Sequence, residues 1–529
     1  MTRKSLFGAL LGLLLLAACA PKEEQPSIVV SLIADGRVRT WSYTTPVTVE
    51  QFLQDVGVQV EEPDRLSPPP YTQITDGMQV TLVRVSEQTE CSNTDIPYGR
   101  RTVPNEGLEP GQEVLAQAGQ NGVMEICYRT ELWDGVPHNR VEVRRTSITE
   151  AQDEIIYVGP TGEIEPVAVT GTLAYFSNNN AWIIRGSSTT KRPLTTTGDL
   201  DPRVFSLSAD GRQLLFTRRA PEADADTLFD QLWLLTDTTR DEDPVSLIPE
   251  NVLYADWVPG RENTISYSTG EARPGEAPGW RALNDLWLMR LDSDTGEALD
   301  VEQILDVSGG GLYGWWGTNY QWSPDGEKLA WIHADSVGLV DLDNGELLPP
   351  LLRFPVFTTG SNWSWRATVS WSPDTSLLAT TVHGMPIGSE PPENSPVFNI
   401  AIADAAGTFQ ATIVDSAGIW SAPAFSPIVT RPDREYPQGY LAYLRARVPH
   451  ESVSGDYDLV VADRDGSNAR TIYPPEGQPG LRAQKLAWSP DGRQLAFIYQ
   501  GNLWIIDVES GIAHQLTLDG GASNPVWTR

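Results

Sequence analysis

Seven aromatic side chains in the second half of the chain are the residues best suited to binding a ligand. Flat aromatic rings in loops stack on sugar rings or hold a peptide. The alternative is that they fill the hydrophobic core, because large aromatic side chains usually pack together. The seven are Tyr313, Trp315, Trp316, Tyr320, Trp363, Trp365 and Trp420, and three glycines at 309–311 precede them.

Residue patterns that indicate catalysis or metal binding are missing from the sequence. The five histidines are scattered outside any His-Glu-x-x-His motif, and there is neither a Gly-x-Ser-x-Gly motif nor a phosphate-binding Gly-Lys-Ser/Thr loop. Acidic runs at 292–296, 341–345 and 463–466 are similar in composition to calcium loops but lack a Glu at the twelfth loop position. We expect hairpin turns there, and we predict no catalytic residue, no metal site and no cofactor.

The net charge of the chain limits the classes of partner that it can bind. The 529 residues carry a formal net charge of -32. A binder of nucleic acid needs a basic surface, and so does a protein that docks electrostatically on anionic lipid. We therefore exclude nucleic acid as a partner.

The first residues have the layout of an export signal. Arg3 and Lys4 precede an apolar run at 6–18, which is short for a membrane span. The run ends in Leu-Ala-Ala-Cys at 16–19, which resembles the lipobox of bacterial lipoproteins. This resemblance implies a signal peptide at 1–18, a lipid on Cys19 and a tether at 19–27. The alternative is an ordinary secretory signal in which Cys19 occurs by chance.

The two remaining cysteines form an even pair in a protein expected to be exported. Cys91 and Cys127 can form a disulfide in an oxidising location. The alternative is two free buried thiols, because sequence does not show whether the two residues meet.

Residues 28–85 are predicted to form a small module of strands and one helix. Asp35-Gly36 indicates a tight hairpin between strands at 28–33 and 37–43. Thr48 and Gln51 form a capping box at the start of a helix, and Gly57 ends it. Together with the Asp-Gly-Met string at 76–78, this pattern resembles the ubiquitin-like domain of YabE-type cell-wall proteins and resuscitation-promoting factors. In those families it commonly precedes a five-glycine (G-five) domain.

Residues 86–160 resemble that G-five domain. The similarity lies in Ile-Pro-Tyr at 96–98, Gly107, Gly111, the Gly-Gln-Asn-Gly string at 119–122, Tyr-Arg at 128–129, Asp-Gly at 134–135 and the closing strand at 155–159. The resemblance implies an extended β module associated with the cell wall or with polymers that contain N-acetylglucosamine. The alternative is a rigid spacer that binds nothing.

Residues 165–529 contain a repeat. Its clearest copies are the Trp-Ser-Pro-Asp strings at 322–325, 371–374 and 488–491, and the intervals between the seven copies predict seven four-stranded blades. The number is six if the unit at Trp257 is irregular. These repeats resemble TolB-like and WD-repeat-like β-propellers, and the strand at 525–528 is expected to complete the first blade. The fold class is therefore mainly β.

These features together predict a lipid-anchored extracytoplasmic protein that binds or scaffolds. It would be held at the bacterial membrane or cell surface by Cys19, contact the cell wall or a glycan through its N-terminal modules, and bind a protein or glycan through the propeller. Two alternatives remain. One is a TolB-like structural component of an envelope complex. The other is a glycan- or peptide-cleaving enzyme with its site in the central opening of the propeller.

Overall fold

The computed structural model describes residues 27–529 except 106–107, 160–161, 163, 222–225 and 429–436. The export signal and the lipidation site predicted at Cys19 lie outside the described residues. The chain divides into two compact units, residues 1–101 with 116–155 and residues 102–115 with 156–529. In the described part, no helix has both the length and the apolar character needed to cross a membrane.

The first module is a four-stranded sheet with one helix. Its elements are β1 (Ile28–Ala34), β2 (Arg37–Tyr43), α1 (Val49–Asp55), β3 (Arg65–Ser67) and β4 (Met78–Val83). The strands lie in the order β2-β1-β4-β3, with β1 parallel to β4. The capping box of Thr48 and Gln51 is confirmed. Phe52 of α1 is fully buried in a core that includes Val30 and Val80, so the apolar face of the helix holds the module together.

Long strands without a thick core follow. One sheet contains β5 (Val85–Ile96), β8 (Gly122–Trp133) and β9 (Val136–Thr149) in that order, and a second contains β6 (Arg100–Pro104), β10 (Glu154–Val158) and β7 (Glu113–Gln117). Every residue of β9 is exposed. Cys91 of β5 lies opposite Cys127 of β8, and the structure joins the two by a disulfide bond of 2.04 Å. Glu125 is close to both sulfur atoms, but disulfide sulfurs are not thiolate ligands for a metal.

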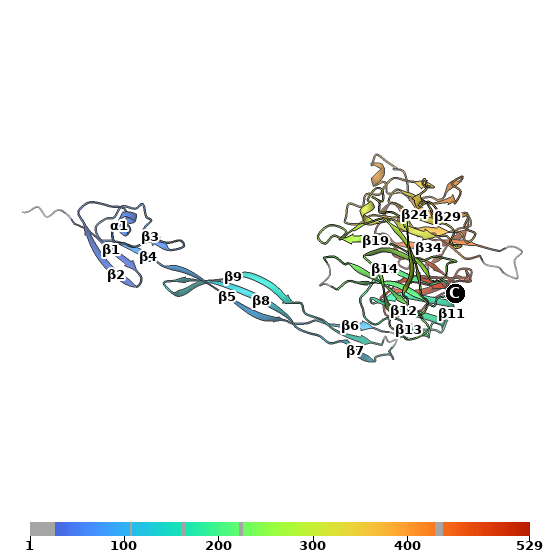
Figure 1. Cartoon of the computed structure of the whole chain (residues 1–529), viewed down its shortest axis with the longest axis horizontal. Coiled ribbons are helices and arrows are strands. Elements are labelled where there is room, and N and C mark those ends of the chain that lie inside the picture. Colours follow the sequence, from blue (N-terminus) through green and yellow to red (C-terminus); the bar gives the residue numbers. More distant parts are fainter. Residues whose placement is uncertain (1–26, 106–107, 160–161, 163, 222–225, 429–436) are drawn as a thin grey trace, which may run out of the picture. The chain divides into compact units, whose positions relative to one another are not determined.

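Seven sheets, five with four strands and two with five, then form the blades of a β-propeller, so the seven-bladed fold is confirmed (Figure 1). Strands are given from first to fourth. Blade 1 contains β40 (Ala522–Thr528), β11 (Ala168–Ser177), β12 (Asn180–Ser187) and β13 (Lys191–Pro193), and blade 2 contains β14 (Leu200–Leu207), β15 (Leu214–Arg219), β16 (Asp230–Leu235) and β17 (Val245–Glu250). Blade 3 contains β18 (Val252–Trp257), β19 (Thr264–Ala272), β21 (Leu286–Leu291) and β22 (Ala298–Leu305), with β20 (Trp280–Ala282) paired to β19.

The remaining four blades follow the same order. Blade 4 contains β23 (Asn319–Trp322), β24 (Leu329–Ile332), β25 (Ser336–Asp341) and β26 (Glu346–Leu347), with β27 (Leu352–Arg353) paired to β25. Blade 5 contains β28 (Val369–Trp371), β29 (Leu377–His383), β30 (Phe398–Asp404) and β31 (Gln410–Val414), and blade 6 contains β32 (Ala424–Phe425), β33 (Tyr440–Ala446), β34 (Tyr457–Asp463) and β35 (Arg470–Tyr473). Blade 7 contains β36 (Ala487–Trp488), β37 (Gln494–Tyr499), β38 (Asn502–Asp507) and β39 (Ala513–Gln515). Three short 3₁₀ turns complete the described elements, η2 (Gly314–Trp316), η3 (Pro392–Asn394) and η4 (Pro449–Glu451).

The repeated Trp-Ser-Pro-Asp string has two structural roles. Within each turn the serine hydroxyl donates to the aspartate, for example from Ser323 to Asp325 at 2.5 Å. The tryptophan indole reaches the preceding blade, as in Trp371 Nε1 to the carbonyl oxygen of Gln321 at 3.0 Å. The unit at Trp257 is also regular, because its indole donates to the carbonyl oxygen of Ser206 in blade 2. The motif thus fixes a turn and joins neighbouring blades.

Closure of the ring by the C-terminal strand is confirmed. β40 pairs antiparallel with β11, with Leu173 opposite Trp527 and Ala174 opposite Val526. The C-terminus accordingly lies beside β11 in Figure 1. First strands of neighbouring blades contact one another, including β14 with β18 and β36 with β40, so these strands surround the axis of the ring.

Candidate functional site

Four of the seven aromatic residues predicted to form a ligand face line one open pocket. This aromatic pocket is formed by Tyr313, Trp315, Trp316 and Trp363 with Ala277 and residues 357–362 and 364, and its volume is about 370 Å³. It lies where the loop before β23 faces the loop before β28. Trp315 is 46% exposed, which leaves its ring accessible to a ligand.

The backbone of the first loop positions these rings. Tyr313 adopts a left-handed conformation with φ of 54° immediately before η2, so the chain reverses sharply there. The Tyr313 and Trp315 rings are perpendicular with centroids 5.4 Å apart. In the second loop, the Thr359 hydroxyl donates to the carbonyl oxygen of Trp363 at 2.7 Å. The pocket therefore combines aromatic surfaces with hydroxyl and amide groups from 358–362, the mixture that small-molecule sites use for orientation.

The other three predicted residues are not part of this pocket. Tyr320 is only 4% exposed, and its ring packs against Tyr254 with centroids 5.3 Å apart, so the prediction of a ligand face is wrong for Tyr320. Burial also raises the pKa of the Tyr320 phenol, and the negative charge of Asp285 adds to this shift. Trp365 is only 2% exposed and belongs to a hydrophobic core cluster, so an exposed ligand face is wrong for Trp365 as well. Trp365 and Trp420 both contribute to the lining of a second cavity.

This second cavity, the axial cavity, has a volume of about 420 Å³. It is lined by β14, by β40 and by the segments just before β28, β32 and β36, which come from five blades around the ring. The indole of Trp365 donates to the carbonyl oxygen of Ile419 at 3.3 Å and forms part of its wall. Three basic residues also line it, Arg203, Arg366 and Lys485.

Sequence reasoning missed these three basic residues because each lies in a different blade. A signal did exist, since each occupies one of the five positions before a repeat copy, at Leu207, Trp371 and Trp488. Arg203 lies in the first strand of its blade, and Arg366 and Lys485 lie shortly before theirs, and these first strands surround the axis. Only the ring closure shows that they converge.

The acidic runs considered for calcium form turns, as expected. Asp292 accepts from the backbone amides of Asp294 and Thr295 between β21 and β22. These hydrogen bonds lower the pKa of the Asp292 carboxyl, the amide of Thr295 contributing most. The runs at 341–345 and 463–466 likewise join the third and fourth strands of their blades.

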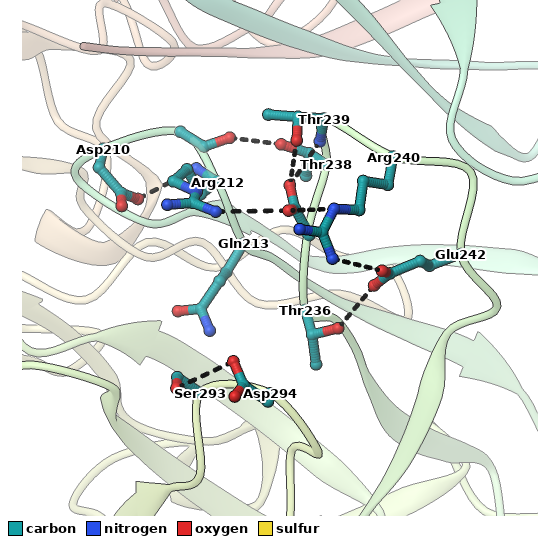
Figure 2. Close-up of polar contacts among 12 residues, drawn as sticks. Asp210, Arg212, Gln213, Thr236, Thr238, Thr239, Arg240, Glu242, Ser293 and Asp294 are labelled. Carbon is teal, nitrogen blue, oxygen red and sulfur yellow. Dashed lines mark hydrogen bonds and ion pairs between the residues drawn. The ribbon is translucent and has the colours of Figure 1, made fainter.

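A separate polar cluster lies at the turns of blade 2. The carboxylate of Asp237 accepts from the amide and the hydroxyl of Thr239 at 2.8 and 2.5 Å. Arg212 and Arg240 both lie 3.4 Å from the Asp237 carboxylate. Figure 2 shows the guanidinium groups of these two arginines pointing toward each other. Because Thr239, Arg212 and Arg240 all contact the Asp237 carboxylate, we interpret this cluster as one that stabilises the fold.

We expect Asp237→Asn to destabilise the protein in a pH-dependent manner. Burial alone would raise the pKa of Asp237, but hydrogen bonds from Thr239 and Arg212 outweigh it and lower the pKa below the usual range. A lowered pKa contributes stability above the unfolded-state pKa of about 4 and loses it as pH falls through the folded value. The substitution should cost about 1–3 kcal/mol at pH 7. Urea unfolding from pH 7 to pH 3 checks that this cost shrinks on acidification.

The exposed Asp294, which accepts from Ser293 at 3.4 Å, is the matched control (Figure 2). Asp294→Asn should change the free energy of unfolding by less than about 0.5 kcal/mol. An equal effect of the two substitutions at pH 7 would contradict a special role of the Asp237 cluster.

Three family descriptions match parts of the chain. They are the G5-linked-Ubiquitin-like domain at residues 30–70, the G5 domain at residues 87–161, and the Dipeptidyl peptidase IV N-terminal region at residues 439–526. Among curated proteins, the resuscitation-promoting factor RpfB of Mycolicibacterium smegmatis is 24% identical over 149 residues. That match covers 28% of this chain and 38% of the relative, so the chain spans well under half of that protein.

Similar solved structures include a putative TolB from Agrobacterium tumefaciens and a puromycin-hydrolyzing peptidase from Mycobacterium tuberculosis. The first is 15% identical, covers 63% of this chain and 96% of its own, and has a TM-score of 0.33. The second is 17% identical, covers 67% of this chain and 53% of its own, and has a TM-score of 0.42. The family matches confirm the two N-terminal resemblances, and the sheets described above establish the propeller. The chain therefore carries a G5-linked ubiquitin-like domain and a G5 domain in front of a seven-bladed β-propeller.

Proposed function

We propose that this protein is a lipid-anchored extracytoplasmic binding protein that associates with the cell wall and uses its propeller to hold a glycan or protein partner. The observation that carries the proposal is the aromatic pocket, an open site with an exposed Trp315 beside hydroxyl and amide groups. Aromatic side chains with one accessible face are the commonest anchors of binding sites.

The association with the cell wall is supported by the N-terminal modules. A G5 domain preceded by its linked ubiquitin-like domain occurs here, and the similarity to a resuscitation-promoting factor extends over 149 residues. All of β9 is exposed, so a polymer has free access to this strand. Attachment through Cys19 rests on the sequence, and mass spectrometry of the membrane-extracted protein would detect a diacylglycerol on that residue.

A binding role is preferred to catalysis because the aromatic pocket contains no acidic or histidine side chain to act as an acid or base. The match of 439–526 to a peptidase description concerns the N-terminal region of that peptidase. Turnover of cell-wall fragments or peptides by the purified full chain would favour the enzyme alternative instead.

We expect Trp315→Ala to weaken binding of the partner about 30-fold, the effect of losing an aromatic anchor worth about 2 kcal/mol. Screening the full chain on a glycan array and in pull-downs identifies the ligand, and calorimetry then compares the affinities. Phe409→Ala is the control, because Phe409 is 51% exposed and lies outside the pocket. Failure to find any glycan or protein ligand, or equal effects of the two substitutions, would contradict the proposal.

Sedimentation with peptidoglycan tests the cell-wall association separately. Trp315→Ala should leave the sedimented fraction unchanged, because the proposed wall contact is made by other modules. Absence of sedimentation by the unmodified full chain would argue against wall binding without affecting the pocket.

A further inference from the structure

The axial cavity is basic in a strongly acidic protein. The chain has a formal net charge of -32, yet three of the residues that line this cavity are Arg203, Arg366 and Lys485, and none of its lining residues is acidic. Positive charges that converge in a recess lined by protein concentrate the local field and attract anions. The local charge is therefore opposite to that of the whole chain.

Arg366 is the most informative of the three. Its guanidinium donates to the carbonyl oxygens of Tyr313 at 2.9 Å and Gly317 at 3.2 Å, and also to its own neighbours Ser364 and Trp365. Across the described ranges it has no carboxylate within ion-pair distance. Burial lowers its pKa to about 10 while Asp335 acts more weakly in the opposite direction, so the group stays protonated at neutral pH.

The partly buried guanidinium of Arg366 contacts only neutral oxygens and keeps its full charge. Removing a charge from water is costly unless an opposite charge compensates it. Arg366 therefore favours an anion at the surface that it lines.

Lys485 contributes a second positive charge, one without a direct partner among the described residues. In the part of the chain that the structure describes, its ammonium group has neither a hydrogen bond nor an ion pair, and it faces the cavity from the segment before β36. Arg203 differs, because Asp230 lies 3.1 Å from it and Asp201 lies 3.8 Å from it. Two of the three positive charges are thus free to act on a ligand.

One acid lies near Lys485 but does not line the cavity. Burial raises the pKa of Asp256, while the hydroxyl of Ser206, donating at 2.6 Å, and the charge of Lys485 both oppose this. Asp256 already accepts from Ser206 and from the amide of Trp257. It consequently does not neutralise Lys485 through direct contact.

The apolar residues that line the rest of the axial cavity favour an organic ligand. Phe205, Trp365, Ile419, Trp420 and Val526 present apolar surface next to the basic groups. The volume of about 420 Å³ lies within the range of small-molecule sites, about 300–1,000 Å³. Four of the five N–H groups of Arg366 already donate to protein oxygens, so Arg366 attracts an anion through its charge and not through the bidentate fork that carboxylates and phosphates both use.

We propose that the axial cavity binds the carboxylate of a small organic molecule, with Lys485 and Arg366 attracting the charge and the aromatic walls contacting the body of the ligand. This site is distinct from the aromatic pocket, and the proposal does not rest on the proposed function. A carboxylate of this size comes from an acidic sugar or from the end of a short peptide. The experiment distinguishes these two sources.

Calorimetric titration of the full chain with two matched pairs of probes tests the proposal. One pair is N-acetylmuramic acid and N-acetylglucosamine, which differ by the lactyl carboxylate. The other is N-acetyl-trialanine and its C-terminal amide. We expect the acid of at least one pair to bind at least tenfold more tightly than its neutral partner, since hydrogen bonds to charged groups are the stronger ones. Whichever acid does so identifies the source.

Two substitutions with the same change of charge locate the site. Lys485→Gln should weaken binding of that acid about tenfold, whereas Lys328→Gln should leave it unchanged, because Lys328 lies in the turn after β23 and does not line the cavity. Trp315→Ala should have no effect either. Among the described residues Lys485 makes no hydrogen bond or ion pair, so its replacement by glutamine should change the thermal midpoint little.

Three results would overturn the proposal. They are equal affinity for acid and neutral partner in both pairs, equal behaviour of the Lys485 and Lys328 variants, and displacement of the bound acid by inorganic phosphate at a lower concentration than that of the acid.

Discussion

Deleting residues 522–529 is expected to abolish cooperative folding of the propeller. This deletion removes β40, which supplies the first strand of blade 1 and pairs with β11 from Thr172 to Ser177. Trp527 is 8% exposed and donates to the carbonyl oxygen of Thr170. Truncating a buried tryptophan to alanine alone costs about 3–5 kcal/mol, and a whole protein is stable by only about 5–15 kcal/mol.

The loss extends beyond the packing of one side chain. Without β40, the ladder groups of β11 face the axis without a partner, and β14 and β36 lose the neighbour that lies between them. Exposed strand edges pair with other chains, so the shortened protein should also associate. Scanning calorimetry and light scattering follow both effects.

Trp527→Ala tests the contribution of β40 with a single substitution, and Ile512→Ala is its control. Trp527→Ala should lower the free energy of unfolding by about 3–5 kcal/mol. Ile512 is 57% exposed in the hairpin of blade 7, and its replacement should cost less than about 0.5 kcal/mol. If the truncated chain retained the unfolding midpoint of the intact protein, ring closure would not be what stabilises the propeller.

Gly326→Ala is expected to destabilise the propeller far more than a chemically identical change elsewhere. Gly326 has φ of 71°, and a Cβ there would lie 1.8 Å from the carbonyl oxygen of Pro259 in the neighbouring blade. Gly511 has nearly the same φ, 70°, but a Cβ there meets no atom within 4 Å. Both changes cost about 1–2 kcal/mol for a left-handed alanine, and only Gly326→Ala adds a clash.

The difference between the two variants therefore measures the close approach of blades 3 and 4. We expect an additional cost of about 1–3 kcal/mol for Gly326→Ala, at the upper end because the opposing atom belongs to the backbone. Urea unfolding of both variants gives the comparison. Equal losses of stability would show that the blades move apart readily at this contact.

The sequence predicted the elements whose causes are local. The Thr48–Gln51 capping box and the turns between Ser323 and Asp325 depend on residues a few positions apart, and both form as expected. Ring closure was also predictable, because the last strand and the incomplete first blade each lacked a partner. Both kinds of signal can be recognised in the amino-acid sequence without the structure.

The sites were less predictable because they depend on loops from different blades. Trp315 and Trp363, both expected on a ligand face, line one pocket, whereas Tyr320, only four residues after Trp316, turns into the core. The alternation of side chains along a strand decides this, and the strand begins at Asn319. The signal for Arg366 and Lys485 is only their position shortly before a repeat copy, and their significance comes from lining one cavity together.

Because β40 pairs with β11, blade 1 cannot be completed until both strands have been synthesised. Trp527 and its acceptor Thr170 are 357 residues apart. At about 5–20 residues per second, roughly 20–70 s separate the synthesis of the two. Blade 1 spends this interval with an uncovered strand, longer than almost any elementary folding event. Exposed strand edges pair with other chains, so β11 is the edge most open to association until β40 is made.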